Sequence, residues 1–567
     1  MKLNHLYRLG IAFILGISST TGLFSADISG QAPDYDIYLL IGQSNMAGRG
    51  SFEAADTIQK VEGVWLLDSI GNPVEAVAPF NRYSTIRKDI SLQGYSPANE
   101  FSRIMHSRSG RDILLVVNAR GGSSICAWQP GDSHQYIDEA VRRTRQAMKH
   151  GTLKGILWHQ GETDVLKETP DYIGKFTTMI TALRDSLDAA EVPVVIGQLG
   201  QWRWATSDKI ESFNDSIVPS ISRSVDNCQY VSSYRLGRLY KDKERDPHFS
   251  RDAQRELGRR YADAMVPLVD SVYVTKFRGN KPAAISFTFD DGDLDHALLV
   301  GPELEKRGYR GTFWVNGKTI ESDDSLRPRM KPYQLRILSD RGHEVSNHSW
   351  SHGKLVRMTP DEARKDIEKN DSVITIYTGK RPVTFCYPYN ATLPWLVEMA
   401  EEGRVGSRLH QTGIGQQNNK MTPDKLKAWV DKVVSAGDWG VGMTHGITMG
   451  YDKWDTPQDL WDLFDYVKQH DNEIWVATFR EVAAYKAERD NTVVRMEPTE
   501  DGFFLSTEMP LDTSLFTEPV TVAVKGNYKD HSIRVMRNDE EVEAVCQDNL
   551  LLVEMLPTND IVRVVVK

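Results

Sequence analysis

Residues 37–48 read IYLLIGQSNMAG, and this stretch decides the fold of the first part of the chain. Its apolar residues end at Gly42, and the polar Gln43, Ser44 and Asn45 follow at once. A buried strand that ends in a polar turn has this pattern. Further apolar runs follow between amphipathic helical stretches at 136–149 and 171–188: ILLVVN from Ile113, GILWHQ from Gly155 and PVVIGQL from Pro193. We therefore expect an α/β domain with a mainly parallel sheet over residues 34–270.

The rest of the chain divides into two further units. A basic stretch with glycine and proline, KFRGNKP from Lys276, predicts a linker over 271–281. Short apolar runs and helical segments alternate again from Ala283, which predicts a β/α barrel over 282–488. Beyond it the helical periodicity stops, and short alternating strands between turn residues predict a small all-β module of the sandwich type over 489–567.

The N-terminal segment predicts export. Lys2 and Arg8 precede an apolar stretch at 9–17, and small residues follow up to Ala26. Residues 1–26 therefore have the organisation of a secretory signal peptide. The alternative is an uncleaved membrane anchor, but the apolar stretch is well short of the ~20 residues that a spanning helix needs. We expect a secreted or periplasmic protein with no integral membrane segment after cleavage.

Composition narrows the class of partner. The 567 residues include 68 Lys and Arg against 78 Asp and Glu, so the net charge is −10. This charge argues against a nucleic-acid partner and against a polybasic membrane anchor, and it favours a neutral partner. The chain has four cysteines, too few for a scaffold built on disulfides.

The first unit contains the groups of a serine hydrolase. Ser44 comes one step past a strand, where a nucleophilic hydroxyl meets substrate at the C-terminal edge of a sheet. Gly121 and Gly122 end another strand and offer backbone N–H groups to an oxyanion. Asp246 and His248 come last, as an acid and a histidine close in sequence. Together these residue types are the parts needed for acyl transfer.

Four blocks of this unit resemble those of a known family. They are GQSNMAG (42–48), GGSSICAWQPG (121–131), HQGETD (159–164) and DPHFSRDAQRELGRRYA (246–262). In this order they are similar to the sialate O-acetylesterase and acetylxylan esterase branch of the SGNH hydrolases, which have a three-layer α/β/α fold. The resemblance implies Ser44 as nucleophile, His248 as general base, and an oxyanion hole made by the N–H groups of Ser44 and Gly122 and the side-chain amide of Gln160.

Two assignments in this unit stay open. The family usually has an Asp three residues before the His, where this chain has Arg245, so either Asp246 or Glu162 is expected to orient the imidazole. Trp202 and Trp204 follow a strand, and each is expected either to stack on a sugar ring or to pack in the core.

The second unit contains a set of metal-ligand types. Asp290 and Asp291 directly follow the strand AAISFTF, and His348 and His352 follow another strand, GHEVSN. A carboxylate and two imidazoles form a three-ligand set with open positions, which suits zinc or another first-row divalent ion. His445 ends a further strand and is a candidate acid at the same rim of a barrel.

Four motifs of this unit resemble the polysaccharide deacetylase family, or NodB homology domain, a distorted β/α barrel. They are TFDDG (288–292), HSWSH (348–352), FCYPYN (385–390) and THG (444–446). The resemblance implies Asp290 as general base, Asp291, His348 and His352 as metal ligands, Tyr389 as backbone oxyanion donor, and His445 as general acid. The chain departs from the family at Cys386, where an Arg usually orients the base, and at Asn390, where a Gly is usual.

Both units would therefore remove acetyl groups from carbohydrate. The leading hypothesis is a secreted two-site deacetylase of an acetylated polysaccharide, with acetylated xylan as first choice. A second hypothesis joins a sialate O-acetylesterase to an amino-sugar N-deacetylase that acts on host glycans or peptidoglycan. In a third hypothesis, only the first unit is catalytic, and the barrel and the β module bind glycan.

Overall fold

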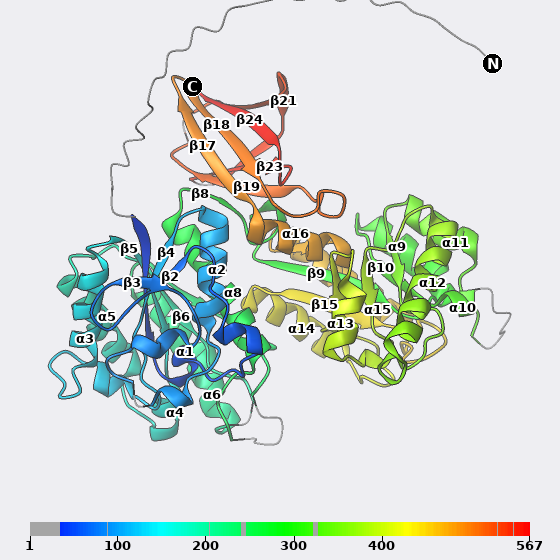
Figure 1. Cartoon of the computed structure of the whole chain (residues 1–567). Helices are drawn as coiled ribbons and strands as arrows, with labels where there is room; N and C mark the ends of the chain where they lie inside the picture. The colour runs from blue at the N-terminus through cyan, green and yellow to red at the C-terminus, as the bar shows by residue number, and fades with distance from the viewer. Residues whose placement is uncertain are drawn as a thin grey trace, which may run out of the picture.

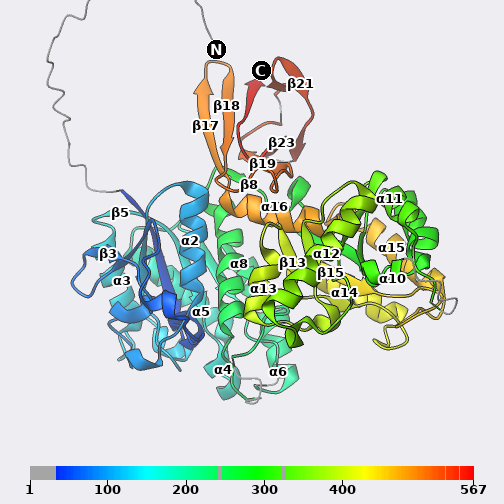
Figure 2. The same ribbon diagram turned by 45° about the vertical axis from the view of Figure 1, so that its right-hand side comes forward.

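The computed structural model describes residues 34–567, except 88, 203, 240–244, 321–326, 530 and 548. The expected signal peptide, 1–26, lies outside these residues. Figures 1 and 2 show two α/β domains side by side and an all-β module above them, with helix α8 at the boundary between the two domains. Within the described part of the chain, no helix combines the length and the apolar character needed to cross a membrane.

The first domain is built on a seven-stranded sheet in the order β3-β2-β4-β1-β5-β6-β7. All neighbours are parallel except β3, which runs antiparallel to β2. The strand bounds are β1 Tyr35–Gly42, β2 Val64–Leu67, β3 Pro73–Glu75, β4 Ile113–Val117, β5 Gly151–His159, β6 Val194–Gly197 and β7 Cys228–Val231. The predicted α/β domain with a mainly parallel sheet is confirmed.

Helices cover both faces of this sheet, which explains why β1 is apolar at almost every position. Ile37 and Leu39 belong to the core shared with helices α3 (Tyr136–Ala147) and α5 (Tyr172–Ser186). Tyr38 and Leu40 point the other way, to the core shared with α2 (Pro97–Ser109) and α8 (Arg251–Val269). Alternate side chains of a strand face opposite sides, so a sheet buried on both faces needs this continuous apolar run.

The second domain has an eight-stranded parallel sheet in the order β13-β12-β11-β10-β9-β15-β14, with β16 also paired to β9. Its strands are β9 Ala283–Phe289, β10 Thr312–Val315, β11 Glu344–Asn347, β12 Thr384–Cys386, β13 Gly406–Arg408, β14 Thr412–Gly413, β15 Trp439–Thr444 and β16 Ile474–Val476. Among the described strands, β13 and β14 do not pair with each other. The predicted barrel is therefore an open, barrel-like parallel sheet. Its helices include α11 (Pro332–Asp340), α12 (Pro360–Thr378), α14 (Pro423–Ala436), α15 (Pro457–Gln469) and α16 (Phe479–Asn491).

The C-terminal module consists of two antiparallel sheets, β17-β18-β24-β20-β21 and β22-β23-β19-β8, which share one apolar cluster. The C-terminal strands are β17 Val493–Thr499, β18 Gly502–Glu508, β19 Val520–Lys525, β20 Ile533–Arg537, β21 Glu540–Val542, β22 Ala544–Gln547, β23 Leu550–Met555 and β24 Asp560–Val566. Strand β8 (Val272–Val274) comes from the stretch 271–281 that we expected to be a linker. It pairs with β19, and the apolar Val274 is buried in the shared cluster. The linker prediction thus needs correction, because the short apolar run ahead of Lys276 completes a sheet.

Buried ion pairs join the parts of the chain. Arg108 of α2 donates to Asp263 of α8 at 2.7 Å and to Asp490 of α16. Arg260 of α8 donates to Asp438, which precedes β15, at 3.0 Å. Because these groups are almost fully buried, removing one partner would leave a charge without compensation. The first domain is therefore held firmly against the second.

Candidate active sites

Ser44 lies where the sequence predicted it, at the C-terminal edge of the first sheet. Strand β1 ends at Gly42, and Ser44 begins the short helix α1 (Ser44–Ala47). Gly42 has φ +134°, and a side chain there would come within 2.2 Å of the His159 carbonyl oxygen. The glycine thus allows β1 and β5 to approach closely at the point where the chain turns to present Ser44.

Ser44, His248 and Asp246 form a connected triad. The Ser44 hydroxyl is 3.0 Å from His248 Nε2. The other ring nitrogen, Nδ1, is 2.9 Å from Asp246 Oδ1, which also accepts the His248 backbone N–H. A carboxylate on Nδ1–H leaves Nε2 free to take the serine proton. Of the two candidate acids, the geometry therefore selects Asp246.

The surroundings of His248 favour the neutral imidazole. Burial lowers the pKa of His248, the negative charge of Asp246 acts in the opposite direction, and the positive charge of Arg49 lowers the pKa further. The net pKa lies below the ordinary value for histidine. At neutral pH the ring is thus available as a general base.

Glu162 holds the loop that carries His248. It begins helix α4 (Glu162–Lys167) and accepts a hydrogen bond from the Asn45 side-chain amide. The same amide nitrogen donates to the Pro247 carbonyl at 3.1 Å, and Asn45 Oδ1 accepts from the Phe249 N–H at 3.3 Å. Burial raises the pKa of Glu162 to about 7. Glu162 therefore acts through Asn45 on the residues on either side of His248, and does not contact the imidazole.

The expected oxyanion donors differ in the contacts that they make. A side chain at Gly121 would lie 3.7 Å from Ser44 Cβ, so this turn packs against the nucleophile, and Gly122 has φ +74°. The Gln160 amide nitrogen, by contrast, donates to Asp164 Oδ2 and is 2.9 Å from the Ser123 carbonyl and 3.1 Å from Gln43 Oε1, so both of its N–H groups have acceptors within the protein. Donation from Gln160 and from the N–H groups of Gly122 and Ser44 to a substrate oxygen stays a prediction.

The two tryptophans of the GQWRW stretch have different environments. Trp204 is only 4% exposed and packs in the core. Trp202 is half-buried, and its indole N–H donates to the Asp246 carbonyl at 2.7 Å. Core packing thus accounts for Trp204, whereas Trp202 lies beside the triad with part of its ring accessible.

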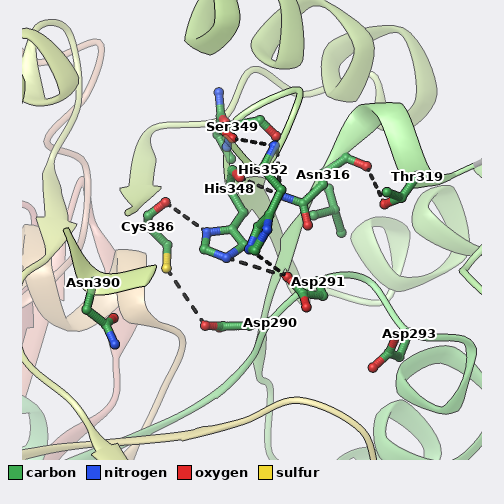
Figure 3. A network of polar contacts seen from close by, with 12 residues as sticks. Asp290, Asp291, Asp293, Asn316, Thr319, His348, Ser349, His352, Cys386 and Asn390 are labelled. Carbon is green, nitrogen blue, oxygen red and sulfur yellow. Dashed lines mark hydrogen bonds and ion pairs between the residues drawn. The ribbon is translucent and has the colours of Figure 1, made fainter. Parts of the chain in front are cut away.

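The second domain brings Asp291, His348 and His352 together as predicted. Asp291 follows β9, and the two histidines follow β11. Figure 3 shows the rings of His348 and His352 directed toward Asp291. Asp291 Oδ1 is 3.3 Å from His352 Nε2 and 3.6 Å from His348 Nε2. One ligand atom from each of the three residues lies within 4.8 Å of the others.

These three residues fit a divalent ion. His348 Nδ1 donates to the Cys386 carbonyl at 2.9 Å, so the lone pair of Nε2 faces Asp291. Burial lowers the pKa of His348 to about 4, which keeps the ring neutral. Asp291 Oδ1 is buried and accepts no hydrogen bond from the described residues, while Arg327 donates to the other oxygen at 2.8 Å. Two neutral imidazoles and a carboxylate oxygen suit zinc or another first-row divalent ion.

Arg408 contacts Asp290 from the strand next to Cys386, the position where the family usually has an arginine that orients the base. It lies on β13 in register with Cys386 of β12, and its side chain is fully buried. Its guanidinium donates to both oxygens of Asp290, to Oδ1 at 2.8 Å, and to the Thr288 hydroxyl at 2.7 Å. Burial raises the pKa of Asp290, but the charge and hydrogen bonds of Arg408 outweigh this effect and lower it. Sequence reasoning missed Arg408, because only the strand register brings it beside Cys386.

The remaining predicted groups line the same cavity, of about 660 Å³. Tyr389 and Asn390 have φ +60° and +54°, and asparagine tolerates this left-handed conformation better than most residues, which accounts for Asn390 in place of glycine. Tyr389 is 58% exposed as a residue, and its ring lies 4.8 Å from the His352 ring, centroid to centroid. His445 follows β15 and packs edge-on against Tyr451 at 4.9 Å. The candidate base, the candidate metal ligands and the candidate acid thus line one cavity.

Two protein-family models match the chain. Residues 34–267 match the family described as "Carbohydrate esterase, sialic acid-specific acetylesterase", and residues 278–402 match "Polysaccharide deacetylase". The first match spans the domain that holds Ser44 and His248, whereas the second covers β9 to β12 with Asp290, Asp291 and the two histidines and ends before Arg408 and His445.

The chain is also similar to individual proteins. A probable carbohydrate esterase of Arabidopsis thaliana is 30% identical over 202 residues, which are 32% of this chain and 75% of that protein. A peptidoglycan-N-acetylglucosamine deacetylase of Bacillus cereus is 29% identical over 133 residues, 23% of this chain and 45% of that protein. The chain therefore spans less than half the length of this deacetylase. A solved structure of an Arabidopsis thaliana protein is 24% identical and covers 42% of this chain and 100% of that one, with a TM-score of 0.37.

Proposed function

The chain belongs to the carbohydrate esterase family of sialic acid-specific acetylesterases and carries a polysaccharide deacetylase domain, and from this premise we propose that it is a secreted two-site deacetylase of acetylated xylan. The observation that carries the proposal is that each domain holds a complete set of hydrolytic groups suited to an acetyl group on a sugar. The net charge of −10 supports a neutral polysaccharide rather than an anionic one such as a sialylated glycan.

The serine site acts by acyl transfer. Ser44 Oγ attacks the acetyl carbonyl while His248 Nε2 takes its proton, and Asp246 stabilises the imidazolium that forms. His248 then gives this proton to the sugar oxygen, which leaves as a hydroxyl. Water repeats the sequence on the acetyl-serine and releases acetate. The N–H groups of Ser44 and Gly122 and the Gln160 amide are proposed to stabilise the oxyanion.

In the second site, different residues bind the metal ion, take a proton and donate a proton. Asp291, His348 and His352 would hold a divalent ion, which when bound polarises a carbonyl and lowers the pKa of water. Asp290, kept ionised by Arg408, takes the proton from the attacking water. His445 is proposed to protonate the leaving sugar atom, and the Tyr389 N–H to stabilise the oxyanion.

The proposed protein has an SGNH-type first domain and a C-terminal β-sandwich, and it is exported. Helices on both faces of the first sheet support an SGNH-type three-layer domain, and two sheets around one core support a C-terminal β-sandwich. The charged, apolar and small-residue order of residues 1–26 supports a signal peptide and export.

A second candidate has the barrel acting on N-acetyl amino sugars. It is favoured by the similarity of this domain to the Bacillus cereus protein, whose name gives N-acetylglucosamine of peptidoglycan as its substrate. In this case the serine site would serve O-acetyl groups of the same polymer or of sialic acid.

Acetate release from three substrates tests the proposal. We expect acetylated xylan to lose acetate in two parts, one that resists a chelator and one that the chelator removes and zinc restores. O-acetyl sialic acid and N-acetylglucosamine oligomers are the matched alternatives. Activity on these two without activity on xylan would support the second candidate. If no part of the activity on any substrate responds to chelator, the barrel is a binding domain.

The Arg408 contact gives a further prediction. In a Ser44→Ala chain, Arg408→Gln is expected to slow chelator-sensitive deacetylation by about 10- to 100-fold, because Asp290 loses its orienting partner while the ligands remain. The double variant Cys386→Arg/Arg408→Cys returns an arginine to the usual family position and should recover part of the rate. Metal content, measured by mass spectrometry, should stay unchanged in both. A normal rate in Arg408→Gln would contradict the role.

A further inference from the structure

A cavity of about 250 Å³ lies at the boundary between the two domains. One wall comes from the loop after β6 and from helix α6 (Ser207–Ser212) of the first domain, and the other from α14 of the second. Figure 1 shows α14 next to α8 at this boundary. The lining side chains include Gln201, Trp202, Glu211, Asp215 and Lys432.

Trp202 connects this cavity to the serine site. Its indole N–H donates to the carbonyl of Asp246, the acid of the triad, at 2.7 Å. Its ring packs edge-on against Phe249, the residue after His248, with 5.2 Å between ring centroids. Trp202 therefore lines the cavity and at the same time contacts the residues on both sides of His248 in the serine site.

The second domain supplies the opposite wall. Lys432 Nζ is 3.5 Å from Asp215 Oδ1 of the first domain and lies over the Tyr234 ring at 5.9 Å. Near this wall, Arg235 donates to the Trp439 carbonyl at 3.2 Å, in addition to the buried Arg260–Asp438 pair. The boundary is thus fixed by several contacts, and Lys432 keeps its place relative to Trp202.

The chemistry of the walls suits an uncharged sugar. A half-buried indole offers an apolar surface to the C–H groups of a sugar ring, and the amide, carboxylates and ammonium around it pair with hydroxyl groups. Glu211 and Asp215 outweigh Lys432, so the wall has a net negative charge that disfavours an anionic sugar. The volume is below the ~300 to 1,000 Å³ of sites for drug-sized ligands, which corresponds to one sugar residue.

We propose that this cavity is a glycan subsite of the serine esterase, which binds one uncharged sugar residue of the polysaccharide beside the acetylated one, and that the deacetylase domain completes it with Lys432. The inference rests on the proposed function of the serine site. If the subsite exists, the second domain contributes directly to substrate binding at the serine site of the first domain.

The test compares two substrates of the serine site in the full-length chain, with chelator present to silence the barrel. The substrates are an acetylated xylo-oligosaccharide and 4-nitrophenyl acetate, which is too small to reach the cavity while its acetyl group is at Ser44. In Lys432→Ala and Gln201→Ala, the ratio of the two kcat/KM values, oligosaccharide over aryl acetate, is expected to fall about 3- to 10-fold, as for the loss of one hydrogen bond. Lys427→Ala, on the same helix but over the Tyr466 ring, is the matched control and should keep the ratio.

A second measurement uses unacetylated oligosaccharides as inhibitors of aryl acetate hydrolysis. Xylo-oligosaccharides should inhibit, with a weaker effect in Lys432→Ala, and oligogalacturonates should not. An unchanged ratio and unchanged inhibition in both variants would overturn the subsite, as would equal loss on both substrates. If the wild-type chain hydrolyses aryl acetate but no acetylated oligosaccharide, the proposed function fails instead.

Discussion

Asp246→Asn is expected to slow hydrolysis of O-acetyl esters by about 10³- to 10⁴-fold, with little change in stability. The carboxylate accepts the Nδ1–H of His248 at 2.9 Å and so fixes the tautomer in which Nε2 accepts the Ser44 proton. An asparagine amide placed there can instead donate to Nδ1, which leaves the proton on Nε2 and blocks the transfer. Hydrolysis of 4-nitrophenyl acetate in the presence of chelator measures the loss.

Glu162→Gln is the matched control for this experiment. Glutamine keeps the oxygen that accepts from Asn45, so the support of the 247–249 backbone should survive and turnover should fall by less than about 10-fold. A thermal unfolding curve for each variant separates folding from chemistry. A larger loss in Glu162→Gln than in Asp246→Asn would transfer the role of triad acid to Glu162.

His348→Ala is expected to remove all deacetylation that remains in a Ser44→Ala chain. The Ser44→Ala change silences the first site, so the remaining acetate release reports on the barrel. Loss of His348 leaves Asp291 and His352 as two ligands, one fewer than the three of a catalytic zinc site. Metal content should fall together with the activity, and added zinc should not restore either one.

His470→Ala is the control for this loss. His470 is on the surface after α15, where it pairs with Glu473 at 2.9 Å, and its removal should change neither metal content nor rate. If the Ser44→Ala chain itself binds no metal and releases no acetate from xylan or from N-acetylglucosamine oligomers, the two-site proposal is wrong.

Site residues that closely follow a strand could be predicted from the sequence. Ser44 lies two residues after β1, and Asp291 and His348 lie within two residues of the ends of β9 and β11. Because parallel strands end at one edge of a sheet, the place of Ser44 at the edge of the first sheet and the meeting of Asp291 with the two histidines at the edge of the second were predictable. The choice between Asp246 and Glu162 was not, because it depends on how the loop before α8 folds back over Asn45. Arg408 was hidden for a similar reason, since its contact with Asp290 depends on the register of β12 and β13.

The position of β8 has a consequence for how the chain folds. Strand β8 precedes the deacetylase domain, whereas its partner β19 follows it, so the barrel is an insertion between two pieces of one β module. During synthesis, the whole deacetylase domain leaves the ribosome after β8 and before β19, so β8 stays unpaired until then. A fragment that starts at residue 282 lacks β8 and leaves the edge of β19 unpaired, which is a site for aggregation. The deacetylase domain is thus inserted into the β module. To study the domains separately, the barrel should be excised and not obtained by truncating the chain at residue 282.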